Sequence, residues 1–440
     1  GRPGPQWIDP YLVYQAYQQH PTWFFRAPSN FGDTVKNYAV RSPWLHETIK
    51  AGYVMADAKF FSNRLRMVGG VRYELTIDEG RGYKQDGNAI YQQDASGHPI
   101  KGSNGAYLLL PSLAGTVSGS GEQNSLIYQY RASYNSRDYA YYFPSLNTTY
   151  NITDNLLLRA GYAETMGRPN VSDVVPTLFV GDNVSFGNGT SAGTYPGFIT
   201  ASNTTLKPWT AKNYDYSLEY YLPRNGLISV DWYKKDIRNF FSTQTSIADV
   251  ALLDKLDLSH DYVGYQYSTR INISDAMIKG WEVNFQLPLQ NLTATGPLER
   301  FDSIARHFTI GLNTTHLELS GSRITASDWK RYIPRSRNAT LRFNFGKVSG
   351  NLLLNWRGKM LRDTASDFPG AAEYIRARYQ LDGNIDYQLT KRYALYLAGR
   401  NILNASSEWE HSGPGPVPYD FMVNYERYGV QYSLGVRGNF

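Results

Sequence analysis

The chain has 440 residues, a net charge of +6 and no cysteine, and tyrosine dominates its aromatic residues, with 36 Tyr against 19 Phe and 9 Trp. The absence of cysteine excludes disulfides and thiolate metal sites, and the seven histidines are too scattered for a histidine-rich metal cluster. No apolar run approaches the roughly 18 to 20 residues of a transmembrane helix, which excludes a helical membrane protein but not a β-barrel.

Residues 1–45 are Pro-rich and are interpreted as an extracellular loop segment. They begin with Gly1-Arg2-Pro3-Gly4-Pro5, which is neither an initiator methionine nor a charged and then apolar signal sequence. We therefore expect the chain to start downstream of a true N-terminus, and residues 46–440 to form a portion of a barrel with long extracellular loops.

From residue 46 onwards, apolar and polar residues alternate in many short segments, and this period places alternate side chains on opposite faces of a β-sheet. In chain order, the clearest segments are 65–76, 214–220, 228–232, 281–285, 341–345, 381–387 and 431–440. A soluble β-sandwich alternates in the same way, so alternation by itself does not decide the class.

The connections between these segments favour a membrane barrel, because tight turns alternate with long polar stretches. The tight turns are at 151–155, 223–226, 346–349 and 390–392. The long stretches run over roughly 78–137, 168–206, 240–265, 320–333, 360–376 and 404–426. Outer-membrane barrels have this arrangement, with short turns on the periplasmic rim and long loops outside. The connection at 288–303 is longer than a turn, and we still assign it to the periplasmic rim.

This arrangement gives about thirteen strands from residue 46 to the C-terminus, whereas single-chain bacterial barrels have an even number. Closing thirteen antiparallel strands would bring two parallel edges together, and an open edge cannot be left in lipid. We therefore predict an all-β fold, a transmembrane antiparallel β-barrel of which the chain supplies the C-terminal portion. The missing strands would precede residue 46.

Several short motifs follow one another in a characteristic order. They are Gly70-Val71-Arg72-Tyr73-Glu74, Gly167-Arg168-Pro169, Leu206-Lys207-Pro208, Lys234-Lys235-Asp236-Ile237, Lys279-Gly280-Trp281-Glu282, Gly399-Arg400-Asn401-Ile402-Leu403-Asn404 and the final Gly435-Val436-Arg437-Gly438-Asn439-Phe440. Each motif alone is weak, but in this order they resemble the barrel of TonB-dependent receptors from about residue 46 to the C-terminus.

The resemblance implies a barrel of about 22 strands and energised uptake of a large, scarce ligand of the siderophore or oligosaccharide class across the outer membrane of a Gram-negative bacterium. The implied partners are the protein's own N-terminal plug and missing strands, the TonB complex through that plug, the barrel assembly machinery, and outer-membrane lipid with lipopolysaccharide. The plug and the TonB-binding box are not visible in this sequence. We expect no enzymatic activity, no cofactor, no metal and no nucleic-acid partner.

Three groups of residues are candidates for function. Charged residues expected to face the lumen, where they contact the plug or cargo or simply fill a polar interior with ion pairs, are Arg72, Glu74, Arg159, Asp215, Glu219, Asp231, Glu282 and Arg342. Ring-bearing residues of the long loops, where a rigid barrel presents adaptable ligand contacts, are Phe179, Tyr195, Phe198, Trp329, Trp409 and His411. Residues that resemble a C-terminal barrel assembly signal, or else belong to an ordinary lipid-facing strand, are Tyr432, Leu434, Val436 and Phe440.

Two other classes stay open at this point. A passive porin or structural barrel is favoured if the missing N-terminal part contains only strands. A soluble β-rich binding protein or carbohydrate-active enzyme would be extracted without detergent. The cargo also stays open among sugar oligomers, siderophores and cobalamin-like molecules, although aromatic residues in the loops favour the first two.

Overall fold

A computed structural model describes residues 9–24, 28–95, 97–182, 195–273, 275–321, 331–364, 372–412 and 421–438. In these ranges the chain is built mainly of strands, and a few short helices occupy the connections. None of the helices in the described ranges is both long and apolar enough to cross a membrane.

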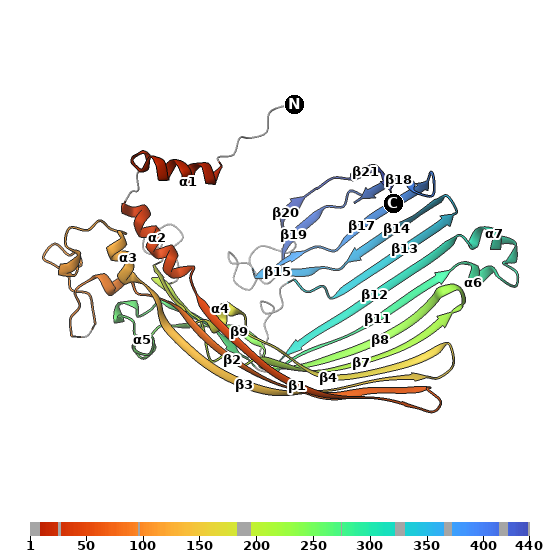
Figure 1. Cartoon of the computed structure of the whole chain (residues 1–440), viewed down its shortest axis with the longest axis horizontal. Coiled ribbons are helices and arrows are strands. Elements are labelled where there is room, and N and C mark those ends of the chain that lie inside the picture. The colour runs from red at the N-terminus through yellow and green to blue at the C-terminus, as the bar shows by residue number, and fades with distance from the viewer. Residues whose placement is uncertain are drawn as a thin grey trace.

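Thirteen strands in series form one curved wall, as the sequence predicts. They are β1 (Trp44–Phe60), β2 (Leu65–Gln85), β3 (Tyr128–Asn151), β4 (Leu156–Gly167), β7 (Trp209–Leu222), β8 (Gly226–Arg238), β11 (Ala276–Pro288), β12 (Phe308–Gly321), β13 (Arg335–Phe345), β14 (Val348–Arg357), β17 (Arg378–Gln388), β18 (Tyr393–Arg400) and β21 (Gln431–Gly438). Each pairs antiparallel with the next. In the described residues β1 and β21 do not pair, so the wall is a partial barrel (Figure 1).

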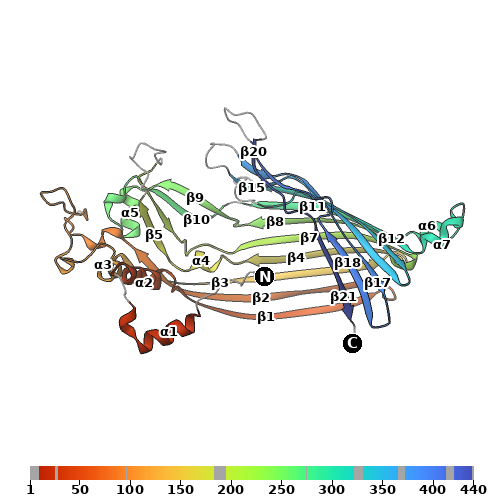
Figure 2. The ribbon, with the colours of Figure 1, turned by 90° about the horizontal axis from the view of Figure 1, so that it is seen from above.

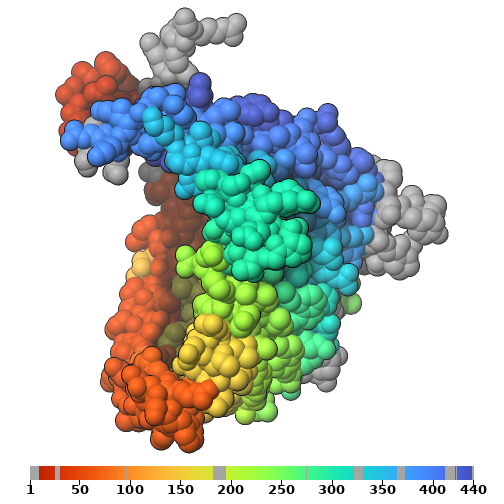
Figure 3. Space-filling model, turned by 90° about the vertical axis from the view of Figure 1, so that its right-hand side faces the viewer, coloured from red at the N-terminus to blue at the C-terminus, as the bar shows by residue number. Residues whose placement is uncertain are grey.

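The wall curves around a hollow, from β1 in orange through green to the C-terminal strands in blue (Figure 3). Its outer face exposes large apolar side chains, with Leu434 79%, Val54 72% and Tyr142 67% accessible. Soluble proteins rarely expose so many apolar residues in continuous stripes, whereas the outside of a membrane barrel must do so. The alternation in the sequence therefore separates an apolar outer face from a polar inner face.

Short turns occupy one rim of the wall, which we call the turn rim (Figure 1). At 61–64 three residues in succession adopt left-handed backbone conformations, with φ of 52° at Phe61, 55° at Ser62 and 69° at Asn63. The connection 289–307 is longer and contains α6 (Gln290–Thr293), η6 (Glu299–Phe301) and α7 (Asp302–Ala305). It also lies at the turn rim, which agrees with the assignment made from the sequence.

The opposite rim, here the loop rim, is more ordered than the sequence indicates. Strands β2 and β3 continue to Gln85 and back from Tyr128, so residues 78–85 and 128–137 are strand rather than the loop expected there. Their polar residues resemble a loop because this part of the inner face is itself polar. Regular elements also fill the remaining connections on this rim: η2 (Gly87–Ile90), η3 (Pro111–Leu113), α3 (Gly121–Ile127), α4 (Val171–Val174), β5 (Leu178–Asp182), β6 (Gly197–Ala201), β9 (Phe241–Ile247), α5 (Val250–Leu256), η5 (His260–Tyr262), β10 (Gln266–Asn272), β15 (Met360–Thr364), β16 (Ala372–Ile375), β19 (Ser407–Ser412) and β20 (Phe421–Glu426).

Two connections combine into a small folded unit, which we call the loop platform. Strands β5, β6, β10 and β9 pair in that order, with β6 and β10 parallel. Figure 2 shows α5 beside these strands. The platform has its own buried core, formed by Leu178, Val180, Ile199, Ala201, Ala248, Leu253, Leu258 and Tyr262. This core stabilises the two connections and holds the side chains on their surface in defined positions.

A second, four-stranded unit consists of β15, β16, β19 and β20, which extend the hairpins of the C-terminal strands. We call it the loop sheet. The segment 1–45, expected to be a loop, contains α1 (Pro10–Gln19), η1 (Pro21–Trp23) and α2 (Pro28–Val40) in its described part. Helix α2 reaches β3 at the loop rim, where the rings of Tyr38 and Tyr130 stack with centroids 4.8 Å apart.

The segment after β4 packs tightly against the inner face of β2. A Cβ atom at Gly82 would overlap the carbonyl oxygen of Pro176. We expect Gly82→Val to displace this segment at a cost of about 1–3 kcal/mol, the usual range for overpacking. Gly52→Val on the outer face of β1 is the matched control, because nothing lies within 4 Å of its Cβ position. Protease cleavage of the full-length protein within 168–208 should accelerate only for Gly82→Val, and equal rates for the two variants would refute the expected packing.

Candidate functional site

The register of the wall places the eight charged candidates on one face. Asp231 on β8 pairs with Ser217 on β7 and with Glu282 on β11. The same face continues through the other candidate positions on either side, from Arg72 and Glu74 on β2 to Arg342 on β13. This face lines the hollow, because the other face carries the exposed apolar stripes. Whether these residues contact a plug or a cargo stays a prediction.

Four of the candidates line one recess on this inner face, with a volume of about 370 Å³. Arg159 pairs with Glu219, with Nε 2.6 Å from Oε1, and also donates to the hydroxyl of Thr149. Asp215 and Asp231 line the same recess, and neither forms an ion pair with another described residue. One cationic and three anionic side chains give the recess a negative balance, which favours cationic or hydrogen-bond-donating groups.

Beside the recess, an amide ladder crosses five strands of the inner face. Asn284 donates to Ser229 at 3.3 Å, Asn313 donates to Asn284, Asn338 donates to Asn313 at 3.4 Å, and Asn355 donates to Asn338 at 2.6 Å. Each rung lies opposite the next in the register from β8 to β14. The ladder keeps this part of the wall polar and uncharged, because each side-chain amide satisfies its neighbour.

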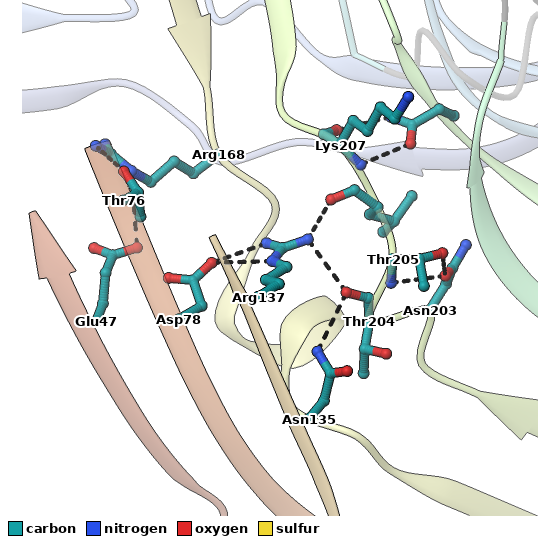
Figure 4. A network of polar contacts seen from close by, with 12 residues as sticks. Glu47, Thr76, Asp78, Asn135, Arg137, Arg168, Asn203, Thr204, Thr205 and Lys207 are labelled. Carbon is teal, nitrogen blue, oxygen red and sulfur yellow. Dashed lines mark hydrogen bonds and ion pairs between the residues drawn. The ribbon is translucent and has the colours of Figure 1, made fainter. Parts of the chain in front are cut away.

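Nearer the loop rim, a polar network fastens a connection to the wall (Figure 4). Arg137 on β3 donates through Nε and Nη2 to Oδ2 of Asp78 on β2, at 3.1 and 3.0 Å. Its Nη1 donates to the backbone carbonyls of Thr204 and Leu206. The Asp78 side chain is 5% exposed and that of Arg137 is 14% exposed. The pair therefore links two wall strands to the segment that precedes β7.

A second arginine in the same network lies just after β4. Arg168 forms ion pairs with Glu74 and, at 3.8 Å, with Glu47, and it donates to the hydroxyl of Thr76 at 3.3 Å. Glu74 also accepts from Arg72, at 2.9 Å. Glu74 therefore joins two arginines from different elements, and this predicted lumen residue holds the start of the connection after β4.

The connection after β2 is tied to the loop platform by a partly buried carboxylate. The hydroxyl of Tyr262 donates to Oδ1 of Asp86 at 3.2 Å and accepts from the backbone N–H of Asn88. Burial raises the pKa of both Asp86 and Tyr262 above their ordinary values. Ser259 adds a hydrogen bond to the carbonyl of Gly97, at 3.0 Å. Connections that are distant in sequence thus form one surface at the loop rim.

Residues 5–402 match a family model described as "TonB dependent receptor-like, beta-barrel". The chain belongs to this family. The match agrees with the thirteen-strand wall, its polar inner face and its short and long connections, and it identifies the wall as part of a transmembrane β-barrel.

Similar proteins include a ferric enterobactin receptor of Pseudomonas aeruginosa, 28% identical over 149 residues, which are 33% of this chain and 18% of that protein. A crystal structure of a variant ferric enterobactin receptor from Pseudomonas aeruginosa has a TM-score of 0.52 at 14% identity, covering 90% of this chain and 54% of that chain. The ferric-catecholate import receptor of E. coli K12 has a TM-score of 0.53 at 12% identity, covering 90% of this chain and 45% of that chain. This chain spans about half the length of these solved receptors.

In this TonB-dependent receptor barrel, the ring-bearing candidates form two separate groups. Phe179 and Phe198 pair across the β5–β6 hairpin of the loop platform, with ring centroids 5.6 Å apart, and Tyr195 precedes β6. Trp409 and His411 lie on β19 of the loop sheet. The guanidinium of Arg362 lies 3.9 Å from the Trp409 ring centroid, so packing already occupies that face. Trp329 lies outside the described residues.

The C-terminal candidates Tyr432, Leu434 and Val436 lie on the outer face of β21, with 67%, 79% and 63% of their surface exposed. Phe440 lies outside the described residues. Their position agrees with a lipid-facing strand, and recognition by the assembly machinery stays a prediction.

Sequence reasoning overlooked Asp78, Arg137 and the amide ladder. A signal for Arg137 is present, because Asn135, Arg137 and Tyr139 follow one another at every second position, which is the strand period. The polarity of this stretch nevertheless favours a loop. No pattern within one strand predicts the ladder, because its members come from five separate strands.

Proposed function

We propose that this chain forms part of the wall and the ligand-facing loops of a receptor in the outer membrane of a Gram-negative bacterium, which imports a siderophore-class ligand with energy delivered by TonB. The observation that carries the proposal is the combination of a family barrel wall, polar on its inside, with a packed loop platform at one rim. A plug and further strands would come from parts of the protein beyond the described wall.

The siderophore class is favoured by two facts. The relatives named above are receptors for ferric enterobactin and ferric catecholates. The loop platform also presents the paired rings of Phe179 and Phe198, and Phe198 is 42% exposed. An aryl group of a catecholate ligand would stack on such rings, and so would the apolar face of a sugar. An oligosaccharide is therefore the second ligand class to test.

The decisive experiment uses the full-length protein expressed in cells that lack other catecholate receptors. We expect growth on a ferric catecholate as the sole iron source, and we expect that growth to cease when TonB is deleted. Growth that persists without TonB would indicate a passive porin instead. Growth on an oligosaccharide as the carbon source, without growth on a ferric catecholate, would show that the ligand is a sugar and not a siderophore.

Ligand contact at the platform is tested by Phe198→Ala. Loss of one stacked ring costs about 0.5–1.5 kcal/mol, so the affinity for a ferric catecholate should fall roughly two- to tenfold in a fluorescence-quenching titration. Phe301→Ala is the matched control, because Phe301 is similarly exposed, at 45%, but lies in the connection at the turn rim. Equal affinities of the two variants would show that Phe198 does not contact the ligand.

A further inference from the structure

The outer face of the wall contains a groove of about 600 Å³ that crosses β11 to β14 and reaches β17. Its sides are large rings, including Trp281, Trp356 and Tyr379. The side chains on its floor are small, because Thr314 and Ala339 occupy the middle positions on β12 and β13. The groove is therefore a consequence of small residues placed between aromatic ones on a face that otherwise presents a continuous apolar surface.

One end of the groove carries a positive charge. The guanidinium of Arg337 lies 5.0 Å from the ring centroid of Trp356, and Arg337 is exposed on the outer face. Arg335 lies on the same face, two positions nearer the loop rim. Neither arginine forms an ion pair with another described residue, whereas nearby Glu318 already pairs with Lys279 and His316. Two cationic side chains thus lie at or beside this end of the groove, and no carboxylate in the described part of the chain neutralises either of them.

The height of Arg337 on the wall matches the edge of the apolar layer. At the turn rim, the ring of Phe345 contacts those of His307 and Phe308, which form an aromatic border. Phe345 lies eight positions after Arg337, which corresponds to about 26 Å along the strand, or roughly 20 Å in height at a tilt of about 40°. The apolar band of such barrels is about 25 Å tall. Arg337 therefore lies close to the headgroups of the leaflet at the loop rim.

We propose that this groove is a lipid-binding site, which holds an acyl chain of lipid A while Arg337 binds one of the lipid's phosphates. The inference rests on the outer-membrane placement proposed above, which puts the loop rim in the leaflet that contains lipid A. A phosphate matches the guanidinium through paired hydrogen bonds. Trp356 holds that guanidinium at the end of the groove, and the apolar sides fit a hydrocarbon chain in a way that a flat wall does not.

The test measures lipid retained by the full-length protein in detergent, by native mass spectrometry, after delipidation and addition of diphosphoryl lipid A. Arg337→Gln keeps a polar side chain but removes the charge and the paired donors of the guanidinium, and we expect about tenfold weaker retention. Arg342→Gln, on the inner face of the same strand, is the matched control and should leave retention unchanged. Ala339→Phe fills the floor of the groove and should weaken retention of diphosphoryl and dephosphorylated lipid A alike. Heat-modifiable electrophoretic mobility verifies that each variant is assembled.

Several results would overturn the proposal. One is equal retention of diphosphoryl and dephosphorylated lipid A by the unmodified protein, and another is equal loss in Arg337→Gln and Arg342→Gln. Phosphatidylglycerol retained as tightly as lipid A would assign the site to phospholipid. A dimer that protects the groove would assign it to a second copy of the chain. Lipid retention is measured without cargo or TonB. A failure of the uptake experiment can therefore be distinguished from a failure of the lipid-binding proposal.

Discussion

Leu352→Arg should destabilise the assembled barrel by about 2–4 kcal/mol, the cost of a cation on the lipid face near the middle of the bilayer. Leu352 lies midway along β14 on the outer face and is 41% exposed. In the register it pairs with Leu341 and Gly383, so no acidic residue lies beside it to compensate a positive charge. Denaturant unfolding of the full-length protein in lipid vesicles measures this change in the free energy of unfolding.

The neighbouring residue provides a matched control, because Leu353 is the same residue type on the opposite face of the same strand. It pairs with Thr340 on β13 and with Asp382 on β17. An arginine introduced by Leu353→Arg would lie in the polar lumen opposite a carboxylate, and we expect a cost below about 1 kcal/mol. Equal destabilisation by the two substitutions would contradict the assignment of the two faces and the membrane placement of the wall.

Arg137→Met should release the connection that precedes β7. The substitution leaves Asp78 buried without its cation, and breaking a buried ion pair in this way costs about 3–5 kcal/mol. It also removes the donors to the carbonyls of Thr204 and Leu206. We expect faster proteolysis of the full-length protein at 203–207, together with a lower transition temperature.

The double variant Arg137→Met with Asp78→Asn separates charge from packing. It removes the uncompensated charge, so stability should recover in part, while the two backbone carbonyls stay without the guanidinium. A double variant as unstable as Arg137→Met alone would show that the buried charge is not the cause. Unchanged proteolysis in both variants would show that the network does not hold the connection.

Properties that depend on one strand at a time can be predicted from the amino-acid sequence. Alternation decides which face each side chain occupies, because the strand period is 2. Alternation therefore predicts the common face of residues as distant as Arg72 and Arg342, and the lengths of the connections predict about thirteen strands and the turn rim. The sequence does not predict how far β2 and β3 extend, since polar residues on a wet face resemble a loop.

The pairs of residues that meet across the wall become apparent from the three-dimensional arrangement of the strands. Arg137 and Asp78 are 59 positions apart, and Tyr262 lies 176 positions from Asp86. The strand period assigns a face but not a partner, because the partner depends on the register between strands and on the folding of the connections. The loop platform, the amide ladder and the groove beside Arg337 all arise from such cross-strand placement, and for that reason no single segment of the sequence reveals them.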